Sequence, residues 1–375
     1  MIIFPLLSRF PTNMAYGVTT EQTANALRSL GYKVLILTSK KDEKIFTEQK
    51  VVGLCKKSQF LILNSNVKNL VGIRLTIFTL IYGLTISFKY RHISNLFWTR
   101  DLLLSLILSF TSSSFIVCEI HRKPSKIGLF YLFVLKKRNK VLLAVISSAL
   151  RIKLGIGEYE SVIAPMSVNS KEIEYFSKIQ GPRKKKIVYL GNLFSGTHKL
   201  NVNLINELAH QMLLDFPDWT IEVIGINKNA FKSSCLKGIP TNLRIIERLG
   251  RQEIMIKLSE SRIGLVIYPN NEYFHDSFPI KIAEYAAAKL AIVASDTVAH
   301  RNILDESRCV YFKSDCLISL KETLARLIND DQLQLRLSQN ASKWVSNLTY
   351  ENRVNAVLKQ LEIQYKTNSV SQGKF

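Results

Sequence analysis

The sequence predicts an α/β fold made of two Rossmann-like domains that face each other across a cleft. Apolar, strand-like runs alternate with helix-like segments along most of the chain, as in parallel sheets covered by helices. A length of 375 residues suits two domains better than a single core. The alternation is interrupted at Gly181-Pro182 and the basic residues 183–186, which predict a linker. We therefore expect domains over residues 1–180 and 181–350, followed by a C-terminal helix and tail over 351–375.

The first domain is expected to open with a β-loop-α-β unit. The apolar start of the chain is typical of a first strand rather than of a signal peptide, because it has no basic segment and no small-residue cleavage site. Gly31 is a suitable C-cap for the first helix, and residues 67–110 have an apolar, helical pattern. The other predicted elements are a strand at 2–7, a helix at 18–30, strands at 33–38 and 115–121, a helix through 129–135 and a strand at 141–147.

The second domain shows a regular alternation after the linker. Its predicted elements are a strand from 187, a helix at 200–216, strands at 220–226 and 243–247, a helix at 251–259, a strand at 263–268, a helix that begins at Pro279, strands at 290–294 and 308–312, and helices to the end. In such sheets, ligands bind beyond the carboxyl ends of the strands.

The charge of the chain is strongly positive. There are 51 Lys and Arg against 29 Asp and Glu, a net charge of +22, and residues 1–180 alone carry +15. This field attracts nucleic acid, anionic lipid or phosphorylated substrates, and charge alone does not choose among them. No aromatic RNA-binding motif or DNA-recognition helix is recognisable, so we expect no nucleic-acid partner.

Cysteine usage and hydropathy indicate a cytoplasmic protein that lies against a membrane without spanning it. The five cysteines are scattered, form no C-x-x-C pair and suit a reducing compartment rather than a zinc site. Residues 75–88 are too short to span a bilayer, and residues 102–118 are broken by a Thr-Ser-Ser-Ser run. With the basic residues around them they are typical of a surface on an anionic leaflet, although helices that pack the domain core are the alternative. These basic residues are Lys68, Arg74, Lys89, Arg91 and Arg100.

The stretch from Asp276 to Asp296 carries the clearest functional signal. The strand before it ends at Pro269, so the following loop leaves the carboxyl edge of the sheet. Pro279 suits the first turn of a helix whose free N–H groups and dipole would bind a diphosphate. Glu284, about one and a half turns along, could accept hydrogen bonds from the vicinal hydroxyls of a ribose. Asp276 could hold further sugar hydroxyls, so the pattern predicts a nucleotide-sugar site. The simpler alternatives are a solvent-facing Glu284 and an Asp276 that only caps the helix.

These residues resemble the donor-binding motif of the family-4 glycosyltransferases, which have the GT-B fold. The motif here is DSFPIKIAE followed by YAAAKLAIVASD, and the family pattern is Glu, seven residues, Glu, then a small-residue helix and a strand. The resemblance covers nearly the whole chain: IVYLGNL resembles the first strand of the donor domain, and CEIHRKP resembles a strand end that carries a histidine near the transferred sugar. The sequence departs from the pattern at Ser277-Phe278-Pro279, which replaces Gly-Phe-Gly, and at Asn192, where an Arg is usual.

The resemblance implies a retaining glycosyltransferase that needs neither a metal nor a cofactor besides its nucleoside-diphosphate-sugar donor. The first domain would bind a glycan or lipid-linked acceptor and the second the donor, with a C-terminal helix that crosses back to the first domain. It implies a role in bacterial lipopolysaccharide or capsule synthesis at the inner face of the plasma membrane. The residues implied are His121 and Asp276 as catalytic groups, and Glu284, Ser277, Phe278, Pro279, Ile280, Lys281, Lys199, Asn192 and Gly17 as donor-binding groups.

Several alternatives stay open from the sequence. His121 could be an ordinary surface histidine, and Lys281 could be a surface lysine whose stem covers apolar groups. The protein could also be a catalytically impaired nucleotide-sugar-binding scaffold, which the departures at Asn192 and at Ser277-Phe278-Pro279 would favour. A sugar epimerase with the same fold is the remaining enzyme alternative.

Overall fold

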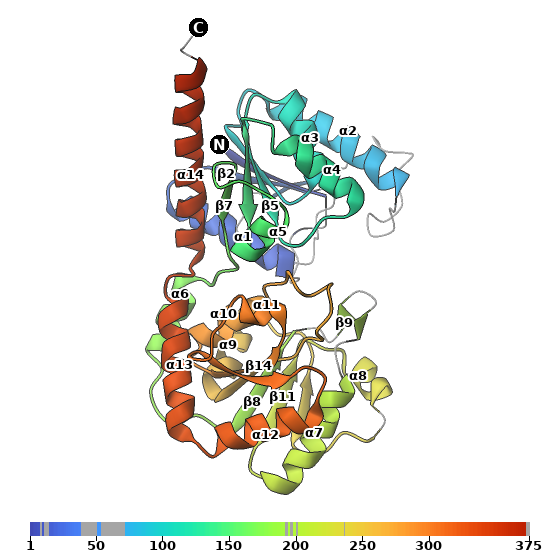
Figure 1. Ribbon diagram of the computed structural model, residues 1–375, viewed down its shortest axis with the longest axis vertical. Coiled ribbons are helices and arrows are strands. Elements are labelled where there is room, and N and C mark those ends of the chain that lie inside the picture. Colours follow the sequence, from blue (N-terminus) through green and yellow to red (C-terminus); the bar gives the residue numbers. More distant parts are fainter. Residues whose placement is uncertain are drawn as a thin grey trace. The chain divides into compact units, whose positions relative to one another are not determined.

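The protein divides into two compact units. A computed structural model describes residues 1–7, 10, 15–38, 51–53, 72–191, 194–195, 198–199, 202–235 and 237–372 (Figure 1). The first unit comprises Met1–Pro165 with Tyr350–Phe375, and the second comprises Met166–Thr349. The boundary therefore precedes the linker predicted at Gly181-Pro182. The reason is that Val168 bridges to Thr349 and packs with Phe176 in the core of the second unit.

The first unit is built on a parallel sheet. Its described strands run in the order β3-β2-β1-β4-β5-β6-β7. Apolar strands fill it because both faces are covered: alternate residues of β1, namely Ile2, Phe4 and Leu6, pack with α1 and α14. The strands are β1 (Ile2–Leu6), β2 (Val34–Thr38), β3 (Val51–Gly53), β4 (Leu96–Thr99), β5 (Phe115–Ile120), β6 (Val141–Val145) and β7 (Ser161–Ile163).

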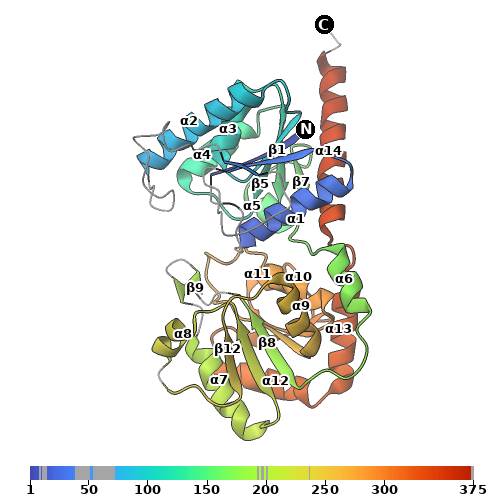
Figure 2. The ribbon, with the colours of Figure 1, turned by 180° about the vertical axis from the view of Figure 1, so that it is seen from behind.

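The helices of the first unit form two groups. α2 packs against α3 and α3 against α4, whereas α1 packs against α14 (Figures 1 and 2). The C-terminal helix α14 contributes the buried Tyr350, Val354 and Val357 to this core, which confirms that the end of the chain returns to the first unit. The helices are α1 (Ala15–Ser29), α2 (Ile73–Tyr90), α3 (Leu102–Thr111), α4 (Lys126–Leu135), α5 (Ser148–Lys153) and α14 (Tyr350–Gln372).

Strand β4 was not predicted. The sequence predicts helical structure throughout residues 67–110, but the chain leaves α2 at Tyr90 and forms β4 between β1 and β5. A central strand of a parallel sheet is buried on both faces, so the short run Leu-Phe-Trp-Thr between two apolar helices has no period-2 pattern to reveal it. No described helix is long and apolar enough to cross a membrane.

The second unit is built on a parallel sheet whose described strands run in the order β12-β11-β8-β13-β14-β15. Besides these, β9 (Phe194–Ser195) and β10 (His198–Lys199) form a short antiparallel pair. The sheet strands are β8 (Lys186–Leu190), β11 (Thr220–Ile224), β12 (Leu243–Ile246), β13 (Ile263–Val266), β14 (Ala291–Asp296) and β15 (Cys309–Lys313). The helices are α6 (Ser170–Ser177), α7 (Val202–Asp215), α8 (Lys228–Ser234), α9 (Arg251–Glu260), α10 (Ile280–Ala287), α11 (Val298–Arg301), α12 (Leu317–Ile328) and α13 (Asp331–Val345).

Candidate functional site

The start of α10 lies beyond the carboxyl end of β13, as the sequence predicts. Pro279 is the N-cap residue, with φ −65°, and Ile280 is the first helical residue. Pro279 therefore stands one position before the first turn, whereas the sequence predicts it within that turn. The cap has no side-chain hydrogen bond, so the first N–H groups of α10 receive nothing from the side chain of the cap. Such a helix start suits an anion.

The loop before α10 holds Asp276, Ser277 and Phe278. Each of these side chains is partly buried. The Ser277 hydroxyl donates a hydrogen bond to the Phe274 carbonyl at 2.5 Å. In this arrangement the hydroxyl proton of Ser277 stabilises the loop and is not offered to a phosphate. Asp276 lies three residues before the cap, on the approach to the helix start.

Lys281 is a buried lysine in the first turn of α10. Only 6% of the residue is exposed. Its Nζ lies 3.9 Å from the centre of the Tyr189 ring and 5.4 Å from that of Tyr268, which are cation–π contacts. Burial lowers the pKa of Lys281 to about 7, although the nearby Glu284 opposes the shift. The surface-lysine alternative is therefore wrong: Lys281 packs inside the unit, at the ends of β8 and β13.

Gly191, directly after β8, makes room for this ammonium group. Its φ of +106° lies in a region that disfavours other residues, and a Cβ built there would lie 3.4 Å from Lys281 Nζ. Asn192 lies outside the described residues. Lys199 lies in β10, and its side chain is not described. Gly17 lies inside α1, which begins at Ala15 rather than at the predicted residue 18.

Glu284 belongs to a cluster of three charged side chains. Its Oε1 accepts a short hydrogen bond from Arg251 Nη1, and Arg251 also donates from Nε to Glu172 Oε1 at 2.6 Å. The exposed fraction is 8% for the Glu284 side chain, 9% for Glu172 and 33% for Arg251. Glu284 is thus neither solvent-facing nor unpaired, and Arg251 holds it through one oxygen. We call Glu172, Arg251 and Glu284 the Arg251 cluster.

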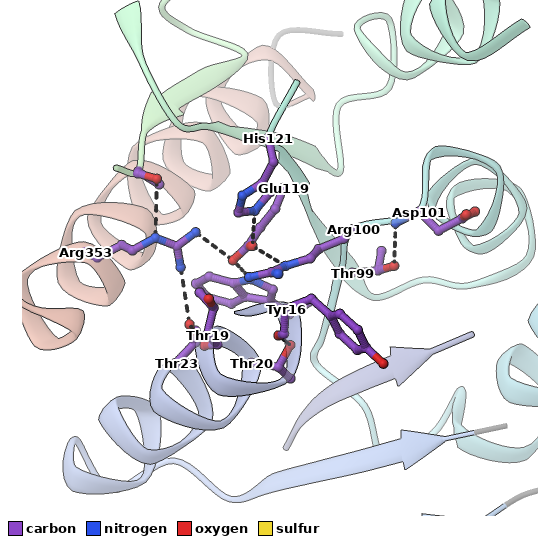
Figure 3. Close-up of polar contacts among 12 residues, drawn as sticks. Tyr16, Thr19, Thr20, Thr23, Thr99, Arg100, Asp101, Glu119, His121 and Arg353 are labelled. Carbon is purple, nitrogen blue, oxygen red and sulfur yellow. Dashed lines mark hydrogen bonds and ion pairs between the residues drawn. The ribbon is translucent and has the colours of Figure 1, made fainter. Parts of the chain in front are cut away.

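In the first unit, His121 follows the carboxyl end of β5 and belongs to a second cluster. Its Nε2 lies 2.7 Å from Glu119 Oε2. The same carboxylate receives hydrogen bonds from Trp98, Arg100 and Arg353, as Figure 3 shows for the two arginines. Burial and the Arg100 guanidinium lower the pKa of His121, against the opposing effect of Glu119. Nε2 of the ring faces Glu119, and a quarter of the His121 side chain is exposed.

Sequence reasoning missed Arg251, Glu119, Arg100 and Arg353. We call Trp98, Arg100, Glu119, His121 and Arg353 the Glu119 cluster. Arg251, Arg100 and Arg353 become visible only through partners elsewhere in the chain: Arg353 lies 234 positions from Glu119. Glu119 had a local signal, because it stands two residues before His121 on one strand and therefore shares its face.

A cavity of about 770 Å³ lies along the edge strand β15 of the second unit. It is lined by charged residues of both signs, among them Arg301, Lys313, Asp315 and Arg336. None of the predicted site residues lines it. We therefore assign the candidate site to the start of α10 and to the Glu119 cluster, each within its own unit, and not to this cavity.

Comparison with known proteins relates the second unit to a sequence family. Residues 171–344, which lie inside the second unit, match the family model of glycosyl transferases group 1. They include α10, the Arg251 cluster and the loop at Asp276. A search of curated protein sequences gives no match.

Solved structures resemble the whole chain at low sequence identity. A glycosyltransferase from Rickettsia africae is 15% identical with a TM-score of 0.67, over 97% of this chain and 98% of that one. WaaG, a glycosyltransferase involved in lipopolysaccharide biosynthesis, is 11% identical with a TM-score of 0.61, over 97% and 99%. HepE of Anabaena, in complex with UDP and glucose, is 12% identical with a TM-score of 0.65, over 98% and 99%. The chain therefore has the GT-B fold, and its second unit matches the glycosyl transferases group 1.

Proposed function

We propose that this protein is a retaining glycosyltransferase of family 4, which transfers a sugar from a nucleoside-diphosphate-sugar to a glycan or lipid-linked acceptor. The observation that carries the proposal is the start of α10. There a buried ammonium group and a buried carboxylate, Lys281 and Glu284, stand one turn apart on a helix without a side-chain cap. The segment lies within the part that matches the glycosyltransferase family model.

The donor would bind to the second unit. The N–H groups at Ile280 and Lys281, together with the Lys281 ammonium group, would neutralise the diphosphate as it leaves. Glu284 would accept hydrogen bonds from the ribose, and Arg251 would keep its carboxylate in place. Asp276 would hold hydroxyls of the transferred sugar. We expect no metal, because the helix start and the lysine supply the positive charge that a divalent ion would otherwise provide.

The acceptor would bind to the first unit, where His121 would contact the transferred sugar. Two related structures suggest which substrates to test first: HepE was solved with UDP and glucose, and WaaG is involved in lipopolysaccharide biosynthesis. Uridine diphosphate sugars are therefore the first donors to test, and bacterial envelope polysaccharides are the first acceptors.

A thermal-shift screen tests the proposal. Nucleoside diphosphates and their sugars should raise the unfolding temperature, because a ligand that binds only the folded state stabilises it by mass action. Mass spectrometry should then detect sugar transfer, or slow donor hydrolysis when no acceptor is present. Donor binding without either reaction would favour the scaffold alternative. No stabilisation by any nucleotide or nucleotide-sugar would contradict the proposal.

We also propose that the first unit lies on an anionic membrane surface. One face of α2 is buried through Phe78, Tyr82 and Ile86, whereas Ile73 and Phe88 are exposed. Core packing thus accounts for part of this apolar helix only. Helix α4, which packs against α3 as α2 does, exposes Ile127, Phe130 and Phe133.

Cations accompany these apolar side chains. Lys137 Nζ lies 4.3 Å from the centre of the Phe133 ring. Arg138 Cζ lies 4.2 Å from the centre of the Phe110 ring, near the end of α3. Aromatic side chains with adjacent lysine and arginine are typical of helices at the interface of an anionic leaflet. Each cation near such a surface contributes about 1 kcal/mol. Lipid-linked acceptors would be delivered there, at the inner face of the plasma membrane.

Sedimentation with vesicles tests this surface. We expect binding to phosphatidylglycerol vesicles at low salt, partial release at high salt and little binding to neutral vesicles. The double variant Phe130→Ser/Phe133→Ser should bind less. Leu214→Ser, which removes an exposed apolar side chain from the second unit, is the matched control and should bind like the wild type. Equal loss in both variants, or binding that ignores lipid charge, would contradict the proposal.

A further inference from the structure

Three of the four side chains that contact the Glu119 carboxylate in the Glu119 cluster can only donate hydrogen bonds, and the fourth is His121. Oε1 accepts from Trp98 Nε1 at 2.7 Å and from Arg353 Nη2 at 2.8 Å. Oε2 accepts from Arg100 Nε at 2.7 Å and lies 2.7 Å from His121 Nε2. Indole and guanidinium groups only donate. Two guanidinium groups within 2.8 Å favour the ionised carboxylate and hold the pKa of Glu119 well below its usual range, so Glu119 is ionised.

This geometry decides which nitrogen of His121 carries the proton. An ionised carboxylate only accepts hydrogen bonds, so Nε2 must donate to Oε2. The alternative orientation of the ring would place a carbon atom, Cε1, against Glu119 and lose the contact. Two forms of the ring remain: the neutral Nε2–H tautomer and the imidazolium.

The charges of the cluster disfavour the imidazolium. Arg100 and Arg353 already give it a net charge of +1, and the side chains of Arg353 and Glu119 are 1% and 2% exposed. A second positive charge in this enclosed position would be costly. The neutral form with Nε2–H therefore remains, and its Nδ1 carries a free lone pair.

We infer that Glu119 is the positioning residue of His121, which it holds as the neutral Nε2–H tautomer so that Nδ1 accepts a hydrogen bond from a substrate hydroxyl. This inference rests on the proposed function and specifies its chemistry. A lone pair matches a sugar hydroxyl, which can donate, and does not match a phosphate oxygen, which can only accept. His121 then orients the sugar and does not bind the diphosphate.

Arg353 extends this arrangement to the C-terminal helix. It donates from Nη1 to Thr23 Oγ1 of α1 and from Nε to the Ala164 carbonyl after β7, both at 3.3 Å. Figure 3 shows the guanidinium between α14 and Glu119. The orientation of the carboxylate is thus fixed by α14, α1 and the strands together, and not by its own strand alone.

Nitrogen-15 NMR of the histidine side chains tests the tautomer in the full-length protein. The chain has six histidines, and His121→Gln identifies the signals of His121 by their loss. At pH 7.5 we expect a protonated Nε2 and an unprotonated Nδ1. An Nδ1–H tautomer or an imidazolium would overturn the inference, whether or not the protein transfers sugar.

Kinetics of Glu119→Gln test the positioning role. The amide has nearly the same shape but no longer forces Nε2 to donate, so we expect turnover to fall about 10- to 100-fold. The KM of the donor should stay within about threefold, because the diphosphate and nucleoside bind elsewhere. Unchanged turnover, or a loss shared equally by KM, would overturn the positioning role.

Arg100→Gln is the matched control, and it keeps the test decisive if Glu119→Gln fails to fold. It removes one cation but leaves the contact between Glu119 and His121. The Nε2–H tautomer should persist and the pKa of His121 should rise, because the repulsion by Arg100 is gone. A change of tautomer in this variant would overturn the inference. Absence of donor binding in the wild type would instead count against the proposed function.

Discussion

The Glu119 cluster of the first unit and the Arg251 cluster of the second unit use the same arrangement with opposite signs. In the first, one carboxylate lies between two arginines, Arg100 and Arg353. In the second, one arginine lies between two carboxylates, Glu172 and Glu284. Each cluster keeps one unit of uncompensated charge, positive in the first and negative in the second.

The two clusters also differ in enclosure. The Glu119 and Arg353 side chains are almost fully buried, whereas a third of Arg251 is exposed. Burial of Glu119 alone would raise its pKa, but Arg353 and Arg100 hold the pKa well below its usual range. The central carboxylate of the first cluster is thus enclosed, whereas the second cluster reaches solvent through its central arginine, Arg251, and keeps Glu284 only 8% exposed.

Replacing the central residue of a cluster should reduce stability more in the Glu119 cluster than in the Arg251 cluster. Glu119→Met leaves Arg100 and Arg353 unpaired, and arginine cannot lose its proton to relieve the repulsion. We expect the free energy of unfolding to fall by about 3–5 kcal/mol. Urea denaturation followed by Trp98 fluorescence, in a Trp219→Phe/Trp344→Phe background, would measure the first unit.

Arg251→Met is the corresponding change in the second unit, and its cost should be smaller. The central arginine of this cluster is one third exposed, so water can solvate the charges that remain, and about 1–2 kcal/mol is expected. Fluorescence of Trp219 and Trp344 would report it. A loss as large as that of Glu119→Met would contradict the difference between the clusters.

A pH titration sharpens the comparison further. Burial lowers the pKa of Lys281 to about 7. Above this pH only a minority of the protein molecules carry the Lys281 ammonium group that an anionic donor would bind. Affinity for a nucleoside-diphosphate-sugar should therefore fall from pH 7 to pH 9, approaching about tenfold per pH unit. Calorimetry should detect proton uptake on binding in this range.

Lys281→Met is the control for this titration. The variant should bind the donor weakly and with little dependence on pH. His121, whose pKa is lowered, should contribute no titration between pH 7 and pH 9. A pH dependence that survives in Lys281→Met would assign the effect to another group.

Much of the architecture follows from local patterns. The alternation of apolar strands and helices predicts the two sheets, and the run from Asp276 to Asp296 predicts α10 and β14 with their carboxylates. The local pattern did not reveal β4, whose three apolar residues and one threonine resemble the helices beside them. The domain boundary failed for another reason: Val168 joins the second unit through Thr349, far along the chain.

The partners of the site residues could not be predicted because they depend on contacts between distant segments. Arg251 lies 33 positions from Glu284 and 79 from Glu172. Nothing in the residues around Arg251 distinguishes it from the other cations of a chain with 51 of them. Glu284 and His121 could be chosen from the sequence, whereas the side chains that orient them required the fold.

Donor binding by two matched variants tests the central claim, that the start of α10 holds the nucleotide of the donor. Glu284→Gln and Glu172→Gln each remove one negative charge, and each weakens an ion pair with Arg251. Only Glu284 belongs to α10. By calorimetry with a nucleoside-diphosphate-sugar that stabilises the wild type, Glu284→Gln should lose about 1.5–3 kcal/mol of binding free energy. Glu172→Gln should lose less than about 0.5 kcal/mol. Equal losses would mean that Glu284 only supports the fold of the unit, and unchanged affinity in Glu284→Gln would contradict the assignment of the donor site.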